Sequence, residues 1–149
     1  MTMAPQTGPW PASTGEMVRR IREHHWAATP LGPIRGWPQH LKAALNLVLE
    51  MPNPATILWG PACIQFYNDA FIAIAGHRHP ALLGLPVGEG WPEVFEEIAR
   101  PLLEAVRTGR ATKLNNLPAQ LRGAGGETEE RLFNINCSPI RDAAGAVNS

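Results

Sequence analysis

Apolar residues in the first third of the chain recur at helical spacing. Between Pro38 and Met51 one apolar stripe follows an i, i+4, i+7, i+8 pattern, which predicts an amphipathic helix. Its members are Leu41, Ala44, Leu45, Val48 and Leu49. Pro38 suits the first turn of this helix. Upstream, Ser13 and Glu16 have the spacing of a capping box, and Met17 and Ile21 follow at helical intervals. A shorter helix is therefore expected to begin near Ser13.

Two short runs rich in Ile, Trp, Phe and Tyr follow, with a composition that favours β-strands. They cover residues 55–59 and 63–67, and the Gly60-Pro61-Ala62 sequence between them is typical of a tight turn. An antiparallel hairpin is therefore expected. After it, Asn68 or Asp69 can cap a brief helix.

The strongest helical pattern lies in the segment 93–109. Its apolar face comprises Val94 or Phe95, followed by Ile98, Leu102 and Val106. Gly109 is a favourable C-terminal stop for this helix. Pro101 is expected to kink it, because the proline ring clashes with the carbonyl group four residues earlier.

The last third of the chain has the pattern of a long hairpin. Strands are expected at residues 111–121 and 131–140, with the glycine-rich turn RGAGGETE between them. Along the second strand, successive side chains point to opposite faces. One face carries Phe133, Ile135 and Cys137, and the other carries Asn134, Asn136 and Ser138.

This order of elements resembles that of a PAS domain. Local motifs closely resemble those of the N-terminal PAS modules of bacterial sensor histidine kinases, in which a W-x-x-x-P-L-G-P-x-x-x-W-P lead precedes a W-G-P…Y-N-D-A hairpin. The matching residues here are Trp26, Pro30, Leu31, Gly32, Pro33, Trp37 and Pro38, followed by Trp59, Gly60, Pro61, Tyr67, Asn68, Asp69 and Ala70. HPALLGLPVGEGWPEVFEEI and SPIRDAAG also match, so the resemblance extends from Glu23 to Asn148.

The resemblance implies an α+β fold in which helices flank an antiparallel β-sheet. We expect a disordered tail at residues 1–12, an N-terminal helical flank at 13–50 and the PAS core at 51–149. In PAS domains the strand after the SPIRD-x-x-G motif is the fifth, and it lies between the first and fourth strands. Because Ser149 follows that motif closely, the fifth strand is expected to be truncated and the sheet incomplete within one chain. A second copy, a rearranged N-terminal segment or direct pairing of the first and fourth strands would then close the gap.

The resemblance also implies sensing, in which a cavity between the sheet and its helices passes its occupancy or redox state to an attached effector. The ligand-binding residues expected here are Phe66, Phe71, Trp91, Phe95, Asn134 and Asn136. Inward amides would orient a polar ligand edge. The alternative for the two asparagines is a solvated outer face, which polar alternation on a strand favours. Large aromatic side chains, in turn, commonly fill cores.

The cofactor stays unknown, with flavin and haem both disfavoured. Flavin-adduct photoreceptors of the PAS type carry a cysteine in the region that corresponds to residues 81–91, and this sequence has none there. The expected long helix has no histidine between residues 93 and 108 that could bind haem iron. His77 and His79 have a spacing that can chelate a metal, but two histidines without a third ligand make a weak site.

The balance of charges and the cysteine content bear on the kinds of partner that the protein can bind. Thirteen Lys and Arg residues balance thirteen Asp and Glu residues, so the basic surface expected of a nucleic-acid or anionic-membrane binder is missing. Cys63 and Cys137 are far apart and outside any metal-ligand spacing, which favours reduced thiols and a cytoplasmic location. The sequence has neither a signal-peptide pattern nor an apolar run of about 18 residues, so no membrane contact is expected.

Three functional hypotheses remain open. The first is a cytoplasmic sensory module that binds a small ligand, forms a homodimer and regulates a downstream effector of the histidine-kinase type. The second is a ligand-free structural dimerisation module whose cavity is filled by its own side chains. The third is a flavin or haem receptor. Catalysis is not expected, because the sequence has no nucleophile elbow, phosphate-binding loop, metalloprotease helix or kinase core.

Overall fold

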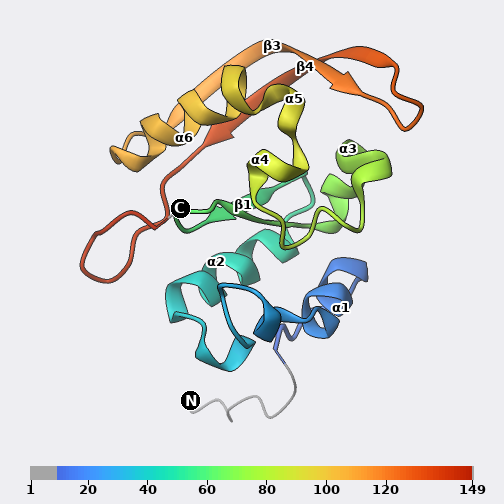
Figure 1. The fold of residues 1–149 in the computed structure, drawn as a ribbon. Coiled ribbons are helices and arrows are strands. Elements are labelled where there is room, and N and C mark those ends of the chain that lie inside the picture. Colours follow the sequence, from blue (N-terminus) through green and yellow to red (C-terminus); the bar gives the residue numbers. More distant parts are fainter. Residues whose placement is uncertain (1–9, 149) are drawn as a thin grey trace.

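The computed structural model describes residues 10–148, which form a mixed α+β fold. The helices are α1 (Glu16–Glu23), α2 (Gln39–Glu50), α3 (Ile72–Ala75), α4 (Val87–Gly90), α5 (Pro92–Val94) and α6 (Arg100–Arg107). The strands are β1 (Thr56–Trp59), β2 (Ile64–Tyr67), β3 (Thr112–Arg122) and β4 (Thr128–Cys137). In Figure 1, α1 and α2 lie on one side of the β1–β2 hairpin, and the β3–β4 hairpin lies on the other side together with α5 and α6.

The strands form two separate two-stranded antiparallel sheets within residues 10–148, where one sheet was expected. Both predicted hairpins are confirmed, with β1 paired to β2 and β3 paired to β4. No ladder of hydrogen bonds joins β1 to β4, and residues 10–50 contribute no strand. Two of the three expected ways of closing the gap, a strand from the N-terminal segment and direct pairing of the first and fourth strands, therefore do not occur within residues 10–148.

The residues around Asn148 lie between the two hairpins. The Asn148 carbonyl oxygen accepts a hydrogen bond from the Gly60 N–H at 2.9 Å, and its N–H donates to the Ile140 carbonyl at 2.8 Å. Its side-chain oxygen lies 2.9 Å from the His40 ring nitrogen Nε2. This residue therefore connects the end of β1, the segment after β4 and helix α2.

The edge of β2 that faces away from β1 is occupied by residues 84–87. Gln65 donates its N–H to the Leu85 carbonyl and accepts from the Gly84 N–H, both at 2.9 Å, and the Val87 N–H donates to the Cys63 carbonyl at 2.9 Å. These bonds place α4 directly beside the β1–β2 turn. They also satisfy backbone groups that a two-stranded hairpin would leave unpaired.

One hydrophobic core joins the N-terminal segment to the strands. Helices α1 and α2 contribute buried residues to the same cluster as the strands β1 and β2. The fully buried members include Met17, Ile21, Leu41, Leu45, Phe66 and Tyr67. The segments 13–50 and 51–149, which the sequence suggested as flank and core, thus share their buried surface.

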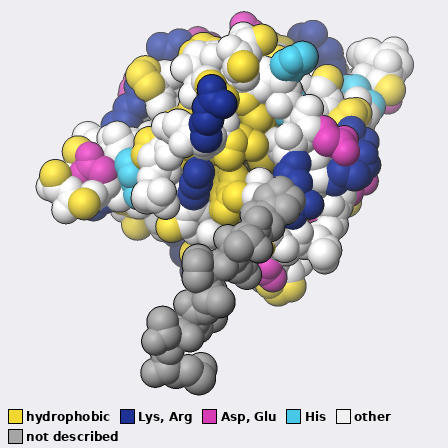
Figure 2. Space-filling view, turned by 90° about the horizontal axis from the view of Figure 1, so that it is seen from below, with side chains coloured by type: hydrophobic (Ala, Val, Ile, Leu, Met, Phe, Trp, Pro, Cys, Tyr) yellow, Lys and Arg dark blue, Asp and Glu magenta, His cyan; other side chains and the backbone are white. Residues whose placement is uncertain are grey.

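Trp10 packs onto this N-terminal layer. Its ring lies 6.0 Å from the Trp37 ring in an edge-to-face arrangement, and its Nε1–H donates to Asn46 Oδ1 at 2.9 Å. Lys42 Nζ lies 5.6 Å from the Trp10 ring centroid. Figure 2 views the molecule from this side and shows hydrophobic side chains between Lys and Arg side chains. Of the tail expected at residues 1–12, positions 1–9 lie outside the described residues.

Pro101 distorts its helix, as its sequence position predicts. A π-helical turn at Phe95–Ala99 separates α5 from α6, and Pro101 occupies the first turn of α6. Proline has no N–H to donate to the carbonyl four residues earlier, and widening of the preceding turn is a common response to such a break. Gly109 follows the end of α6 with a positive φ of 85°, which glycine adopts without strain.

The second strand of the β3–β4 hairpin is shifted by three residues from its expected position at 131–140. β4 begins at Thr128 and ends at Cys137, and the turn before it is tight: the Gly123 N–H donates to the Glu127 carbonyl at 2.7 Å. The pairing register shifts between Leu114 and Leu117, and Asn116 has a positive φ of 54° at this bulge.

Candidate functional site

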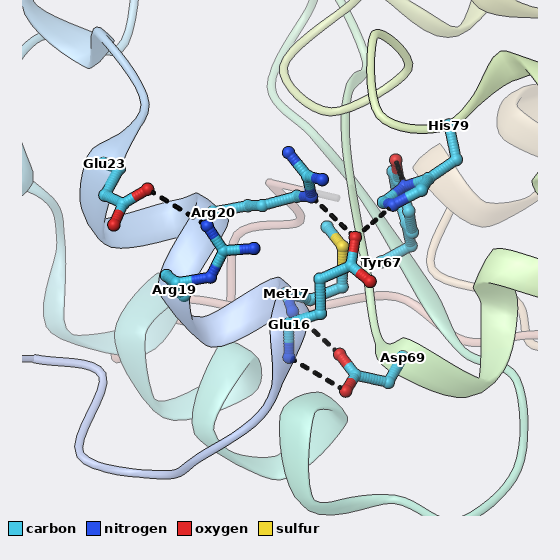
Figure 3. Close-up of polar contacts among 8 residues, drawn as sticks. All are labelled: Glu16, Met17, Arg19, Arg20, Glu23, Tyr67, Asp69 and His79. Atoms are coloured by element: carbon cyan, nitrogen blue, oxygen red, sulfur yellow. Dashed lines mark hydrogen bonds and ion pairs between the residues drawn. The ribbon is translucent and has the colours of Figure 1, made fainter.

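Helix α1 is held to the rest of the molecule by a remote cap. It begins at Glu16, and Gly15 precedes it without a side chain that could satisfy the first N–H groups. The Asp69 carboxylate accepts hydrogen bonds from the N–H groups of Glu16 at 3.1 Å and Met17 at 2.8 Å (Figure 3). A carboxylate at this end also interacts favourably with the helix dipole. The capping box expected at Ser13 is therefore replaced by Asp69.

A second polar contact joins α1 to the loop after α3. Glu16 Oε2 accepts from Arg20 Nε at 2.7 Å and lies 2.5 Å from His79 Nε2. The other ring nitrogen of His79 lies 2.7 Å from the Tyr67 hydroxyl. Figure 3 shows these side chains in one line from α1 to β2. We refer to Glu16, Arg20, Tyr67, Asp69 and His79 as the α1 clasp.

The chemistry of the clasp is structural. When the Nε2–H of His79 donates to Glu16 and its Nδ1 accepts a hydrogen bond from the Tyr67 hydroxyl, each of these side chains has a partner. Burial raises the pKa of Tyr67 to about 12, so its hydroxyl keeps its proton near neutral pH. The weak metal site considered for His77 and His79 gains no support, since no group of three or more His, Cys, Asp or Glu residues in positions 10–148 suits a metal ion.

The clasp should make stability depend on pH through Glu16. Hydrogen bonds from Arg20 and then His79 hold the pKa of this carboxyl below its ordinary value of 4.5. Its contribution is fully present above pH 4.5 and is lost as the pH falls through the lowered pKa. Thermal melts of the wild type and Glu16→Gln should therefore differ in Tm at pH 5.5, and the difference should shrink as the pH falls below 4.5.

Glu23→Gln is the matched control for this comparison, because Glu23 is exposed and its pair with Arg19 on the same helix is long, at 3.5 Å. Exposed pairs of this kind contribute little to stability. A Tm difference for Glu16→Gln that does not shrink at any pH below 4.5 at which the protein stays folded would show that the glutamate acts by packing instead of by charge.

A cavity of about 310 Å³ lies between the β1–β2 turn and the helices that follow α4. Three separate segments line it: the turn at residues 61–63, residues 86–89 at the start of α4, and one face of the π-turn and α6. The last group comprises Phe95, Arg100, Leu103, Glu104 and Arg107. The lining therefore combines apolar side chains with four charged ones, those of Glu89, Arg100, Glu104 and Arg107.

Cys63 and Arg107 fix one wall of this cavity. Cys63 is buried and has a positive φ of 53°, a conformation that is uncommon for residues other than glycine. Arg107 Nη2 donates to the Pro61 carbonyl at 3.2 Å and lies 3.4 Å from Cys63 Sγ. The arginine therefore ties the C-terminal end of α6 to the β1–β2 turn.

The glutamates of the cavity lack such partners. Arg100 donates to Glu96 at 2.8 Å and lies 5.2 Å from the centroid of the Phe95 ring. Glu89 and Glu104 are exposed, and within residues 10–148 neither forms a hydrogen bond or an ion pair. The cavity thus carries two partnered cations and two unpartnered carboxylates.

The predicted aromatic residues occupy three different places. Phe95 lines the cavity. Trp91 and Phe71 lie together, with ring centroids 6.4 Å apart, and Trp91 Nε1 donates to Gln65 Oε1 at 2.9 Å. Phe66 has no exposed surface and is packed in the core against the Trp26 ring at 5.1 Å. Only Phe95 of the four is thus placed on the cavity wall.

The two predicted asparagines lie on the exposed face of β4. Both side chains are exposed, whereas Phe133 and Ile135 on the opposite face are half-buried. Asn134 Oδ1 accepts a hydrogen bond from the Asn116 N–H at 2.9 Å and so completes the bulge in β3. The solvated outer face, which strand alternation favoured, is therefore the arrangement in the structure.

Sequence reasoning missed the polar residues of the cavity. Arg100, Glu104 and Arg107 follow one another at intervals of four and three residues, which places them on one helix face. That spacing was an available signal. The turn that faces them contains Cys63, and nothing local in the sequence shows that α6 packs against it.

A second hollow of about 390 Å³ lies between α1 and the loop at residues 80–83. Its titratable residues are Arg20, Glu23 and His24. Burial lowers the pKa of His24, and the neighbouring His25 lowers it further, so this ring is neutral near pH 7. Only α1 and one loop line this hollow, whereas the first cavity joins three segments, and we therefore regard the first as the better candidate site.

Neither a scan against models of protein families nor a search of curated proteins finds a match for this chain. None of the helices within residues 10–148 has the length and hydrophobicity needed to cross a membrane. Function is therefore inferred from the sequence motifs and from the geometry of the cavity.

Proposed function

We propose that this chain is a cytoplasmic sensory PAS domain that binds a small molecule and regulates an attached effector of the histidine-kinase type. The motifs between Glu23 and Asn148 support this proposal. So does the order of elements, in which a helical flank, a short hairpin, short helices, an interrupted longer helix and a long hairpin follow one another. No catalytic step is proposed for the chain itself.

The cavity beside the β1–β2 turn is the observation that carries the binding proposal. Its volume of about 310 Å³ is at the lower end of the range for small-molecule sites. A ligand in it would contact the turn, α4 and α6 at the same time. The Gly60 N–H, at this turn, donates a hydrogen bond to the Asn148 carbonyl. A shift of the turn would therefore move the residues that follow β4.

Ligand binding can be tested by native mass spectrometry and by thermal melts with a small-molecule library. We expect a bound species or a rise in Tm for the wild type, since a ligand that binds only the folded state stabilises it by mass action. Leu103→Trp should abolish the response, because Leu103 is half-buried on the cavity wall and the larger side chain would fill the space.

Leu132→Trp is the matched control, because Leu132 is 65% exposed on the outer face of β4. It should leave the ligand response intact. An equal loss of response in both variants, or no response of the wild type to any compound, would contradict binding in this cavity. A visible absorption band in the purified wild type would instead favour a flavin or haem receptor.

The ligand-free dimerisation module is the second candidate, and the filled aromatic core favours it. Phe66 lies between the Trp26 ring at 5.1 Å and the Trp37 ring at 5.5 Å, so side chains of the chain itself occupy this part of the core. A homodimer in light scattering together with the absence of any ligand response would select this function over the first.

A further inference from the structure

We infer that the cavity beside the β1–β2 turn selects small organic cations, namely amines or ammonium compounds with a short apolar body. The inference rests on the proposed function, because it names the ligand class of the same cavity. It is carried by the distribution of partnered and unpartnered charges around the cavity and by the aromatic ring in its wall.

Two glutamates and two arginines line the cavity, so its preference depends on which of these charges are already paired. Glu89 and Glu104 line the cavity, and neither has a partner within residues 10–148. A ligand ammonium group at the edge of the cavity would gain an ion pair with one of these carboxylates without breaking an existing pair.

Both cavity arginines already have partners. Arg107 Nη2 is directed at the Pro61 carbonyl and at Cys63 Sγ, and Arg100 is paired with Glu96. A carboxylate or phosphate ligand would have to compete with Glu96 for Arg100 and with the Pro61 carbonyl for Nη2 of Arg107. It would also lie close to the charge of Glu89 and Glu104, which disfavours an anion.

The Phe95 ring shows how a cation can be held here. The Arg100 guanidinium lies 5.2 Å from its centroid, within the distance of a cation–π contact. The Arg100 side chain is 51% exposed, so it can move into solvent. An ammonium ligand would then find an aromatic face and free carboxylates around one cavity, with Val87 and Leu103 beside its apolar body.

Three probes of similar size and different charge test the inference: phenethylammonium, 3-phenylpropionate and 3-phenylpropanol. Their dissociation constants can be measured by ligand-observed NMR titration of the full chain at low ionic strength. We expect the dissociation constant of the cation to be at least about fivefold lower than that of the anion. Two ion pairs at partly exposed carboxylates would account for a difference of this size. Added salt should reduce this preference.

Glu104→Gln and Glu89→Gln should each raise the dissociation constant of the cation about two- to fivefold, and leave that of the alcohol unchanged. Glu97→Gln is the control, because Glu97 is exposed on the same helical segment but does not line the cavity. All three replace exposed residues and should fold normally, which circular dichroism verifies.

The outcomes separate this inference from the proposed function. Tighter binding of 3-phenylpropionate, or equal weakening by Glu97→Gln and Glu104→Gln, would overturn the cation preference and leave ligand binding itself standing. Failure of all three probes, together with no response in the library screen, would overturn both.

Discussion

Replacing Asn68 by alanine should lower the free energy of unfolding by about 3 to 4 kcal/mol, because several buried polar groups would lose their partners at once. The Asn68 side chain is almost fully buried. Its oxygen accepts from the N–H groups of Ala55 and Phe71, each at 3.1 Å. Its Nδ2 group donates to the carbonyl oxygen of Val48, in the last turn of α2. It also donates to those of Met51 and Asn53, which follow this helix.

Urea unfolding monitored by tryptophan fluorescence would measure this loss. Asn68→Asp separates the two halves of the side chain, because it keeps both acceptor bonds and removes the donors to the carbonyl groups. It should therefore also destabilise the fold. Asn136→Ala, at an exposed position on β4, is expected to change stability by no more than about 0.5 kcal/mol. Equal effects of Asn68→Ala and Asn136→Ala would show that the hydrogen bonds of Asn68 contribute nothing.

Asn68 also shows which part of the fold the sequence could reveal. The sequence offered Asn68 or Asp69 as the cap of a helix here, and Asn68 caps the turn at Asp69–Phe71, because the capped N–H group is only three residues away. Its bonds to the residues between α2 and β1 were not predicted, because those groups lie 13 to 20 residues earlier in the chain. Local hydrogen-bonding preferences identify the residue, and tertiary packing determines its remaining partners.

The difference between local patterns and contacts with distant residues also explains which part of the prediction for α1 was correct. Periodicity correctly indicated a helix with Met17 and Ile21 on its buried face. Its first residue was wrong, because the cap comes from Asp69, 53 residues further along the chain from Glu16. A capping box is a local pattern, so sequence reasoning assigned the cap to Ser13, the nearest suitable side chain.

The hairpins were predictable because they depend on local patterns. The arrangement of the two sheets relative to each other was not predictable from such patterns. β1 and β2 are separated by one tight turn, and alternation along β4 correctly separated Phe133 and Ile135 from the exposed asparagines. The relation between the hairpins depends on contacts between distant segments. The cavity depends on them as well, because it forms where α6 meets the β1–β2 turn.

Trp26→Ala tests whether the N-terminal segment is part of the cooperative core. The Trp26 side chain is 2% exposed, its Nε1–H donates to the Ile21 carbonyl at 2.7 Å, and its ring stacks on Phe66 at 5.1 Å. Truncation removes an aromatic ring from the centre of the core and leaves a cavity. We expect a loss of about 3 to 5 kcal/mol in unfolding free energy, measured by urea denaturation.

Trp10→Ala provides the comparison, because Trp10 is only partly buried at the edge of the same aromatic cluster and contacts Trp37 edge to face. Trp10→Ala should lower the free energy of unfolding by about 1 kcal/mol. If residues 10–50 were an independent flank, Trp26→Ala would create a separate early transition and leave the melting of the strands unchanged. A single transition shifted as a whole is expected instead, since Trp26 and Phe66 lie in one cluster and the loss of either partner weakens the packing of both segments.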